Sequence, residues 1–342
     1  MTRLTASATS LAIICVLAGA AAAQDESVSA ELRQASYKTW NIILPAEKWL
    51  PVDGIKLPHA GGEGFRAVQD QMSLEIDTNA DGKLDQKVKG TTGYAVFRGK
   101  YQDGSKLAYA VRFFLNGAVY SYAMSGAMVG SIDGVSIKLI DQNANGRYDE
   151  FGKDAMIVGS GNAASFLSRL VNLKGKIHEL TVSPDGRKIE AKPYQGETGS
   201  LSVRKGFKSN GKLLSAVVSN EAGDVSFNLA GQKAVTVPVG NYRFSAGLAK
   251  KGGEEAELRP GDMKPLAVTA DNAISVKFGA PLKADFHYTR DGTKIDVQPN
   301  VRFLGSAGEE WLNFRPDAKS PKLTFHDAET GKLLTSKRFD GC

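Results

Sequence analysis

The stretch Ser136-Ile-Lys-Leu-Ile-Asp-Gln-Asn-Ala-Asn-Gly-Arg-Tyr-Asp149 changes character at Asp141. Its first five residues form a short run that is mostly apolar and partly β-branched, a pattern that predicts a strand. From Asp141 onward Asp, Asn and Gly predominate, and these residues favour tight turns because they tolerate or stabilise turn backbone conformations. The stretch therefore predicts a strand that runs directly into a tight loop rich in oxygen-bearing side chains.

The same pattern occurs earlier, where Ser73-Leu-Glu-Ile76 precedes Asp77-Thr-Asn-Ala-Asp-Gly-Lys-Leu-Asp85. The first loop (77–85) and the second loop (141–154) match at loop positions 1, 3, 5, 6 and 9. Calcium takes several hard oxygen ligands at once, and this spacing turns alternate side chains inward, while position 7 contributes a backbone carbonyl. The predicted calcium ligands are Asp77, Asn79, Asp81, Lys83 and Asp85 in the first loop, and Asp141, Asn143, Asn145, Arg147, Asp149 and Asp154 in the second.

Both loops resemble the calcium loop of EF-hands and, more closely, the loops of dockerin-like and other secreted bacterial repeats. They depart from an EF-hand at position 12, where Val88 and Gly152 replace the bidentate Glu. Their flanks are also strand-like, so we expect strand-loop-strand sites with a structural rather than a sensor role. The alternative is that each loop is an Asx-Gly hairpin turn that holds no metal.

Asx-Gly pairs recur along the rest of the chain, and short alternating apolar runs such as 176–182 flank them. This combination is the strongest local signal for β-hairpins. Helical periodicity is poor, and we expect short helices only near Ala30–Thr39 and Ala163–Leu170. The predicted fold is mainly β: an antiparallel β-domain with two strand-loop-strand calcium sites, followed by one or two β-sandwich modules.

The length of 342 residues predicts more than one hydrophobic core. We expect a signal peptide at 1–23, an N-terminal arm at 24–60, a β-domain with both calcium loops at 61–195, and sandwich modules at 196–342. An internal boundary near 260 is possible in the last segment. There, Val237–Ser245 resembles the turn and strand of prealbumin-like sandwiches, and Pro321–Leu334 resembles the closing hairpin of an immunoglobulin-like module.

The N-terminus indicates export. Arg3 is followed by an apolar run at 11–19 and by small residues at 20–23, as in a cleaved secretory signal. The run is shorter than the ~20 residues that span a bilayer, and no later segment reaches that length. We expect a secreted or periplasmic protein without a membrane span in the mature chain, in which Cys342 is the one remaining cysteine.

Composition and motifs bear on partners and catalysis. The net charge of +6 is spread among mixed charges, so nucleic acid is not an expected partner. The four histidines are isolated, and we find no G-x-S-x-G nucleophile elbow and no catalytic cysteine pattern. A carbohydrate platform would need Trp40, Trp49, Trp311, Tyr120 and Tyr122 together, although such residues more often lie in a core.

Together these features predict an exported, non-enzymatic calcium-binding β-protein that contacts a protein or glycan of the cell envelope or the extracellular space. The alternative is an extracellular hydrolase or a carbohydrate-binding accessory protein. A carboxylate pair in a cleft with aromatic walls would favour the alternative.

Overall fold

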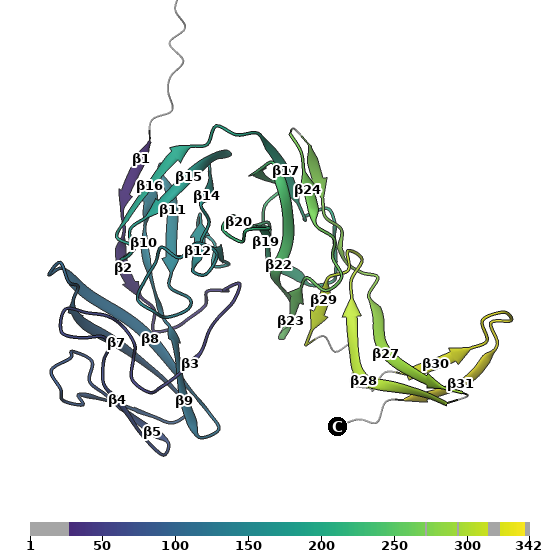
Figure 1. Cartoon of the computed structure of the whole chain (residues 1–342), viewed down its shortest axis with the longest axis horizontal. Coiled ribbons are helices and arrows are strands. Elements are labelled where there is room, and N and C mark those ends of the chain that lie inside the picture. The colour runs from purple at the N-terminus through teal and green to yellow at the C-terminus, as the bar shows by residue number, and fades with distance from the viewer. Residues whose placement is uncertain (1–26, 271, 293, 314–321, 339–342) are drawn as a thin grey trace, which may run out of the picture.

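A computed structural model describes residues 27–338 apart from 271, 293 and 314–321. The predicted signal peptide and Cys342 lie outside the described residues. Every regular element within the described residues is a β-strand, most of them antiparallel, which confirms a mainly β fold. The strands follow one another through two neighbouring units and end in an extended hairpin region (Figure 1).

The two predicted helices are wrong. Residues near 30–39 form β1 (Val28–Glu31) and β2 (Arg33–Ser36), and residues near 163–170 include β13 (Ser165–Phe166) and the first residue of β14 (Leu170–Leu173). β1 pairs with β16 (Lys188–Pro193), and β2 pairs with β10 (Gly126–Ile132). These distant partners override the weak helical preference of the local sequence.

The first unit contains four small sheets. One has the order β1-β16-β15-β14, with β15 at Lys176–Val182, and a second has the order β13-β12-β11-β10-β2, with β11 at Val135–Ile140 and β12 at Ala155–Val158. A third joins β3 (Leu50–Pro51) to β9 (Val119–Met124), β8 (Lys106–Asn116) and β7 (Thr92–Lys100). The fourth consists of β4 (Ala67–Asp70), β5 (Ser73–Ile76) and β6 (Gln86–Lys89).

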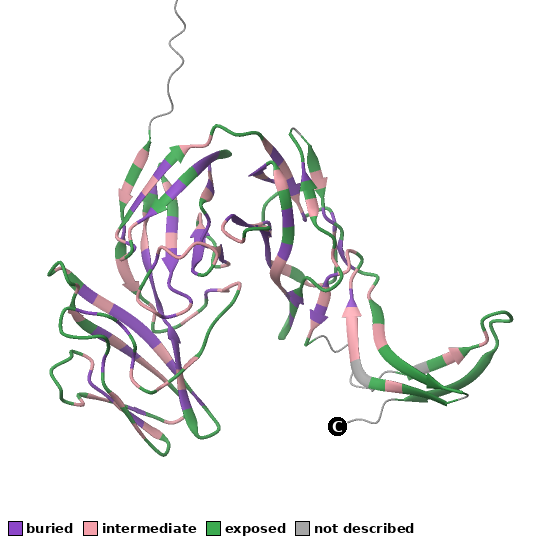
Figure 2. Cartoon of the chain, in the orientation of Figure 1, coloured by how far each residue is buried: buried purple, intermediate pink, exposed green. Residues whose placement is uncertain are grey.

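One hydrophobic core, from Leu32 to Ala191, serves this unit. It includes residues of the predicted arm, such as Ile55 and Leu57, so residues 28–57 pack against the same core as the strands that follow. Alternation along β8 shows how the core is built, since Phe113 is buried and its neighbour Phe114 is exposed. Figure 2 shows many buried residues along β8, β9 and β11.

The second unit has its own core, mainly from Leu201 to Trp311. Its largest sheet includes β20 (Ser226–Asn228), β19 (Lys212–Asn220), β22 (Gly240–Lys251), β23 (Glu254–Arg259), β29 (Glu310–Leu312), β28 (Lys294–Leu304) and β27 (Lys283–Asp291), with β24 (Leu266–Val268) beside β22. Parallel pairs join β17 (Thr198–Ser202) to β25 (Ala273–Ser275) and β18 (Phe207–Lys208) to β26 (Phe278–Gly279). β21 (Val235–Pro238) completes the small sheet beside β17.

The last described strands, β30 (Lys322–His326) and β31 (Leu333–Arg338), pair as an antiparallel hairpin. This hairpin falls where the sequence resembles the closing hairpin of an immunoglobulin-like module. All six residues of β31 are exposed, and the pair forms a two-stranded sheet of its own (Figures 1 and 2). The sandwich architecture of this region stays a prediction.

The neighbouring phenylalanines of β8 provide a test of the first core. Phe113 is 1 % exposed and Phe114 is 44 % exposed. Phe113→Ala should lower the free energy of unfolding by about 3–5 kcal/mol, because it removes a buried ring and leaves a cavity. Phe114→Ala is the matched control and should cost about 1 kcal/mol or less. Urea unfolding measures both, and equal effects of the two variants would contradict this core.

Candidate metal centre

The two loops share one backbone conformation. Ala80 and Ala144, at loop position 4, have φ of 60° and 55°, and the glycines at position 6 have φ of 88° and 84°. Side chains are strained in this left-handed region, whereas glycine adopts it readily. Gly146 has a second reason to be glycine, because an added Cβ would lie 2.7 Å from Leu57 Cδ1. The repeat in the sequence is therefore also a repeat in structure.

The carboxylate at position 1 organises both loops in the same way. Gly82 N donates to Asp77 Oδ2 at 2.8 Å, and Gly146 N donates to Asp141 Oδ2 at 2.6 Å. The position-5 side chain then accepts from the backbone N at position 7, at 2.9 Å in each loop, from Lys83 to Asp81 and from Arg147 to Asn145. These bonds hold the side-chain oxygens on the inner side of each turn.

The first loop connects β5 to β6 and is largely exposed apart from Asp77. Asn79 Oδ1 accepts from Asp81 N at 3.0 Å. Asp85, the predicted ligand at position 9, instead accepts from the backbone N and the hydroxyl of Thr78, both at 2.9 Å. The structure thus brings Asp77, Asn79 and Asp81 into one turn, with the carboxylate of Asp85 bound to Thr78 on its margin.

The second loop connects β11 to β12 and is much more buried. Asp141 is fully buried and accepts from Tyr109 Oη at 2.7 Å and from Asn145 N at 3.1 Å, besides Gly146. Asp154 is 1 % exposed, and its Oδ2 accepts from Glu150 N at 3.0 Å. Two acidic side chains at opposite ends of the loop are therefore removed from water.

Several buried oxygens of the second loop have no hydrogen-bond partner among the described residues: Asp154 Oδ1, Asn143 Oδ1 and Gln142 Oε1. Buried polar atoms are normally paired, because an unpaired one costs about 1–3 kcal/mol. Two of these atoms belong to predicted ligands. A cation with oxygen ligands would satisfy them, so the donor set of this loop fits calcium.

Glu150 is a candidate ligand that sequence reasoning did not select. Its Oε2 accepts from Asn143 Nδ2 at 2.9 Å and also from Asn145 Nδ2, and its Oε1 pairs with Lys153 Nζ at 3.1 Å. It therefore lies against the two predicted amide ligands. The available signal was its position directly after Asp149, which made it a second acid at the end of the loop.

Asp149 is the predicted ligand that the structure places least favourably. Arg147 binds both of its carboxylate oxygens, at 3.1 and 2.9 Å. The Arg147 side chain is 55 % exposed, so this is a surface ion pair of about 0–1 kcal/mol that a divalent cation could displace. The backbone carbonyl of Arg147 remains the predicted position-7 ligand.

Burial raises the pKa of both interior carboxyls. The pKa of Asp154 rises to about 9, first because burial disfavours its charge and second because Asp141 is negative nearby. Burial also raises the pKa of Asp141 to about 6, against the opposing effect of the Tyr109 and backbone hydrogen bonds. The second loop without metal is thus a place where negative charge is unfavourable and a cation would be stabilising.

Among the described residues, no group of three or more His, Cys, Asp or Glu side chains converges as a metal-binding group. Asparagine side chains and backbone carbonyls make up much of both predicted shells. No helix among the described residues is long and apolar enough to cross a membrane.

The residues of the possible carbohydrate platform do not assemble. Trp40 and Trp49 each contact the Arg112 guanidinium, at 4.4 and 5.0 Å from their ring centroids. Trp311 belongs to the core of the second unit, and Tyr120 and Tyr122 are buried in the first. The tyrosines and Trp311 are core residues, as their residue types more often are.

The chain was compared with models of protein families, with curated proteins and with solved structures, and none of them matches it.

The pKa of Asp154 generates a testable prediction. Because the folded state keeps protons on Asp154 and Asp141 that the unfolded state has released, metal-free protein should lose stability as pH rises from about 4 to about 9. Asp141 contributes only up to about pH 6. Each proton contributes a slope of at most about 1.4 kcal/mol per pH unit.

Asp154→Asn should flatten the part of this dependence between pH 6 and 9, while Asp291→Asn, in the exposed far hairpin, should leave it unchanged. Urea midpoints measured in chelator across this pH range test the difference. An unchanged slope in Asp154→Asn would show that Asp154 is ionised in the folded protein.

Proposed function

We propose that this protein is an exported, non-enzymatic calcium-binding β-protein whose metal ions stabilise the first unit. The single observation that carries the proposal is the second loop, where Asp141 and Asp154 are buried and oxygens of Asp154 and Asn143 have no partner among the described residues. A bound cation would compensate the buried carboxyls and satisfy the unpartnered oxygens. The matching backbone of the first loop supports a second site.

The ligand chemistry favours calcium over other metals. The candidate side chains are carboxylates and amides, which offer hard oxygens, with no cysteine or histidine among the predicted ligands. Calcium accepts six to eight oxygen ligands in flexible geometry, whereas magnesium requires a tight octahedron. The irregular strand-loop-strand geometry suits the larger, more tolerant ion.

The two loops should differ in affinity. The second loop has Asp141 and Asp154 buried, and Glu150 lies against the predicted amide ligands Asn143 and Asn145. In such a buried setting a cation interacts more strongly with carboxylates than it does in water. The exposed first loop supplies Asp77 and Asp81, with Asp85 engaged by Thr78. We propose that the second loop is the tighter site and that calcium joins β11, β12 and the loop into one rigid body.

The proposed role is structural. Export would place the chain where calcium is near millimolar, and a site with a Kd of about 10⁻⁴ M, as in extracellular modules, would then see calcium at about 10 times its Kd. Saturation to this degree stabilises the folded state by about 1.4 kcal/mol per site. Two such sites would supply a substantial part of a typical domain stability of about 5–15 kcal/mol. The second unit then extends as a contact arm toward envelope or extracellular partners.

Asp154→Asn should separate the metal-binding role from a purely structural one, because its two expected effects have opposite signs. In chelator the variant should unfold at a higher temperature than the wild type, since an unfavourable buried acid is gone. In millimolar calcium it should unfold at a lower temperature, since a ligand is gone. Asp291→Asn is the control and should match the wild type in both buffers. If calcium leaves the wild-type melting curve unchanged, both loops are hairpin turns only.

Terbium, which occupies oxygen-rich calcium sites, offers a direct reading of the second loop. Tyr109 Oη lies 2.7 Å from Asp141 Oδ2, close enough for an excited tyrosine to sensitise terbium luminescence at that site. We expect a tyrosine-excited terbium signal that calcium displaces and magnesium displaces poorly. Glu150→Gln should weaken terbium binding several-fold, and Asp85→Asn should leave this signal in place. Emission that survives Glu150→Gln and Asp154→Asn unchanged would place the ion elsewhere.

A further inference from the structure

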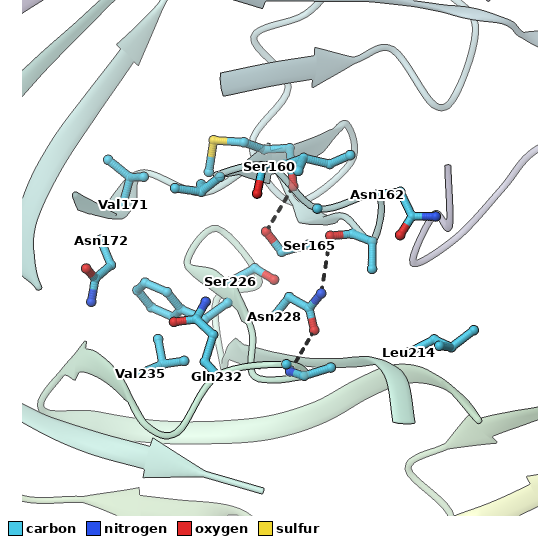
Figure 3. A pocket seen from close by; sticks show the side chains of 18 of the residues that line it. Ser160, Asn162, Ser165, Val171, Asn172, Leu214, Ser226, Asn228, Gln232 and Val235 are labelled. Atoms are coloured by element: carbon cyan, nitrogen blue, oxygen red, sulfur yellow. Dashed lines mark hydrogen bonds between the residues drawn. The ribbon is translucent and has the colours of Figure 1, made fainter. Parts of the chain in front are cut away.

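One feature that the calcium proposal leaves unused is a cavity of about 460 Å³ between the two units. β12, β13 and β14 of the first unit form one side, and β19, β20 and β21 of the second form the other (Figure 3). Cavities of this size at the boundary between units are the usual place for a small ligand. Its chemistry, and not its size alone, indicates what it would take.

No acidic, basic or histidine side chain lines the cavity, although charged residues make up 23 % of the chain. Its polar groups are amides and hydroxyls: Ser160, Asn162, Ser165, Asn172, Ser226 and Gln232. Figure 3 shows Ser165, Ser226 and Asn228 near the centre, with Asn172 toward one side and Asn162 toward the other. A charged ligand would lose its hydration here without gaining a counter-charge, so the lining selects against ions.

Some of these groups are already used by the fold. Asn228 braces the two units, because its Nδ2 donates to Ala163 O at 3.2 Å and its Oδ1 accepts from Ala216 N and Ala230 N. Asn172 Nδ2 donates to Thr236 O at 3.1 Å, again across the boundary. These contacts hold the cavity walls in place. Asn162 Nδ2 also donates to Asn41 O at 2.8 Å and Ser165 Oγ to Met156 O at 3.4 Å. The groups that remain for a ligand are Ser160, Ser226 and Gln232.

Among the remaining groups, Ser226 gives the strongest indication of a bound ligand. It is 1 % exposed, and its Oγ has no hydrogen-bond partner among the described residues. A buried hydroxyl without a partner is costly, and a bound ligand would satisfy it. The Gln232 side chain is exposed at the margin and can both donate and accept.

We propose that this cavity binds a neutral saccharide of one or two rings. Sugar hydroxyls donate and accept at once, which matches serine hydroxyls and primary amides. The apolar part of the lining, including Val171, Leu214, Phe227 and Val235, suits the C–H faces of a sugar ring. The inference is independent of calcium binding.

The test is calorimetric titration of the mature protein, in calcium-containing buffer, with a panel of neutral mono- and disaccharides and with glucuronate as the charged comparison. We expect at least one neutral sugar to bind and glucuronate not to bind. Ser226→Ala should weaken binding by about 2- to 10-fold, the effect of one neutral hydrogen bond. Ser226→Ala leaves no new polar group unpaired, so the fold should be kept.

Ser160→Trp is a second variant that places a bulky ring at an exposed position of the lining and should abolish binding. Gln195→Ala, an exposed glutamine outside the cavity, is the matched control and should bind as the wild type does. The proposal is overturned if no sugar of the panel binds to folded protein, if glucuronate binds as well as neutral sugars, or if both cavity variants bind normally. Because calcium stays constant, none of these outcomes depends on the metal loops.

Discussion

The carboxylate of Asp141 is the interaction on which the geometry of the first unit depends. It is fully buried, yet it accepts from the Tyr109 hydroxyl of β8 and from two backbone N–H groups of its own loop. It therefore ties the end of β11 to a neighbouring sheet and closes the turn before β12. A buried charge is tolerated only where hydrogen bonds or a counter-charge compensate for lost hydration. Here the hydrogen bonds supply part of that compensation, and the proposed cation would supply the rest.

The two loops show how one local conformation can serve different environments. Their glycines, left-handed alanines and position-1 hydrogen bonds agree closely. The first loop joins two strands of a small three-stranded sheet and faces solvent, whereas the second lies under Leu57 and against Tyr109. Burial then changes the chemistry, because the pKa of Asp154 rises to about 9 only where water is excluded. The same motif would thus form an exposed site in one place and an interior site in the other.

The boundary between the two units is held by directional bonds as well as by packing. Asn172 and Asn228 each reach a backbone carbonyl of the other unit, and Arg169 pairs with Asp224 at 3.0 Å beside them. These hydrogen bonds and this ion pair lie around an open cavity and do not fill it. These contacts hold the two units in a fixed relative position. They leave uncharged hydrogen-bonding groups facing a space of ligand size.

The strand-loop-strand course of 73–89 and 135–158 was predictable from sequence, because Asx and Gly residues impose turn conformations locally and alternating apolar runs pair as strands. The helix predictions at 30–39 and 163–170 were wrong. β1 and β2 form hydrogen bonds with β16 and β10, about 90 to 160 residues away in the chain. β13 and β14 likewise pair with β12 and β15. Asp154 was selected from its place after the loop, whereas Glu150 was not, because its contact with Asn143 and Asn145 depends on how the loop folds back.

The sequence by itself thus determined the β class and the loop conformations, which rest on interactions within a few residues. Only the tertiary structure decided which loop is buried, which carboxyls hold protons, and where Asn, Gln and Ser side chains meet across two units. Burial, desolvation and cavity shape arise from segments far apart in the chain, and no local pattern encodes them.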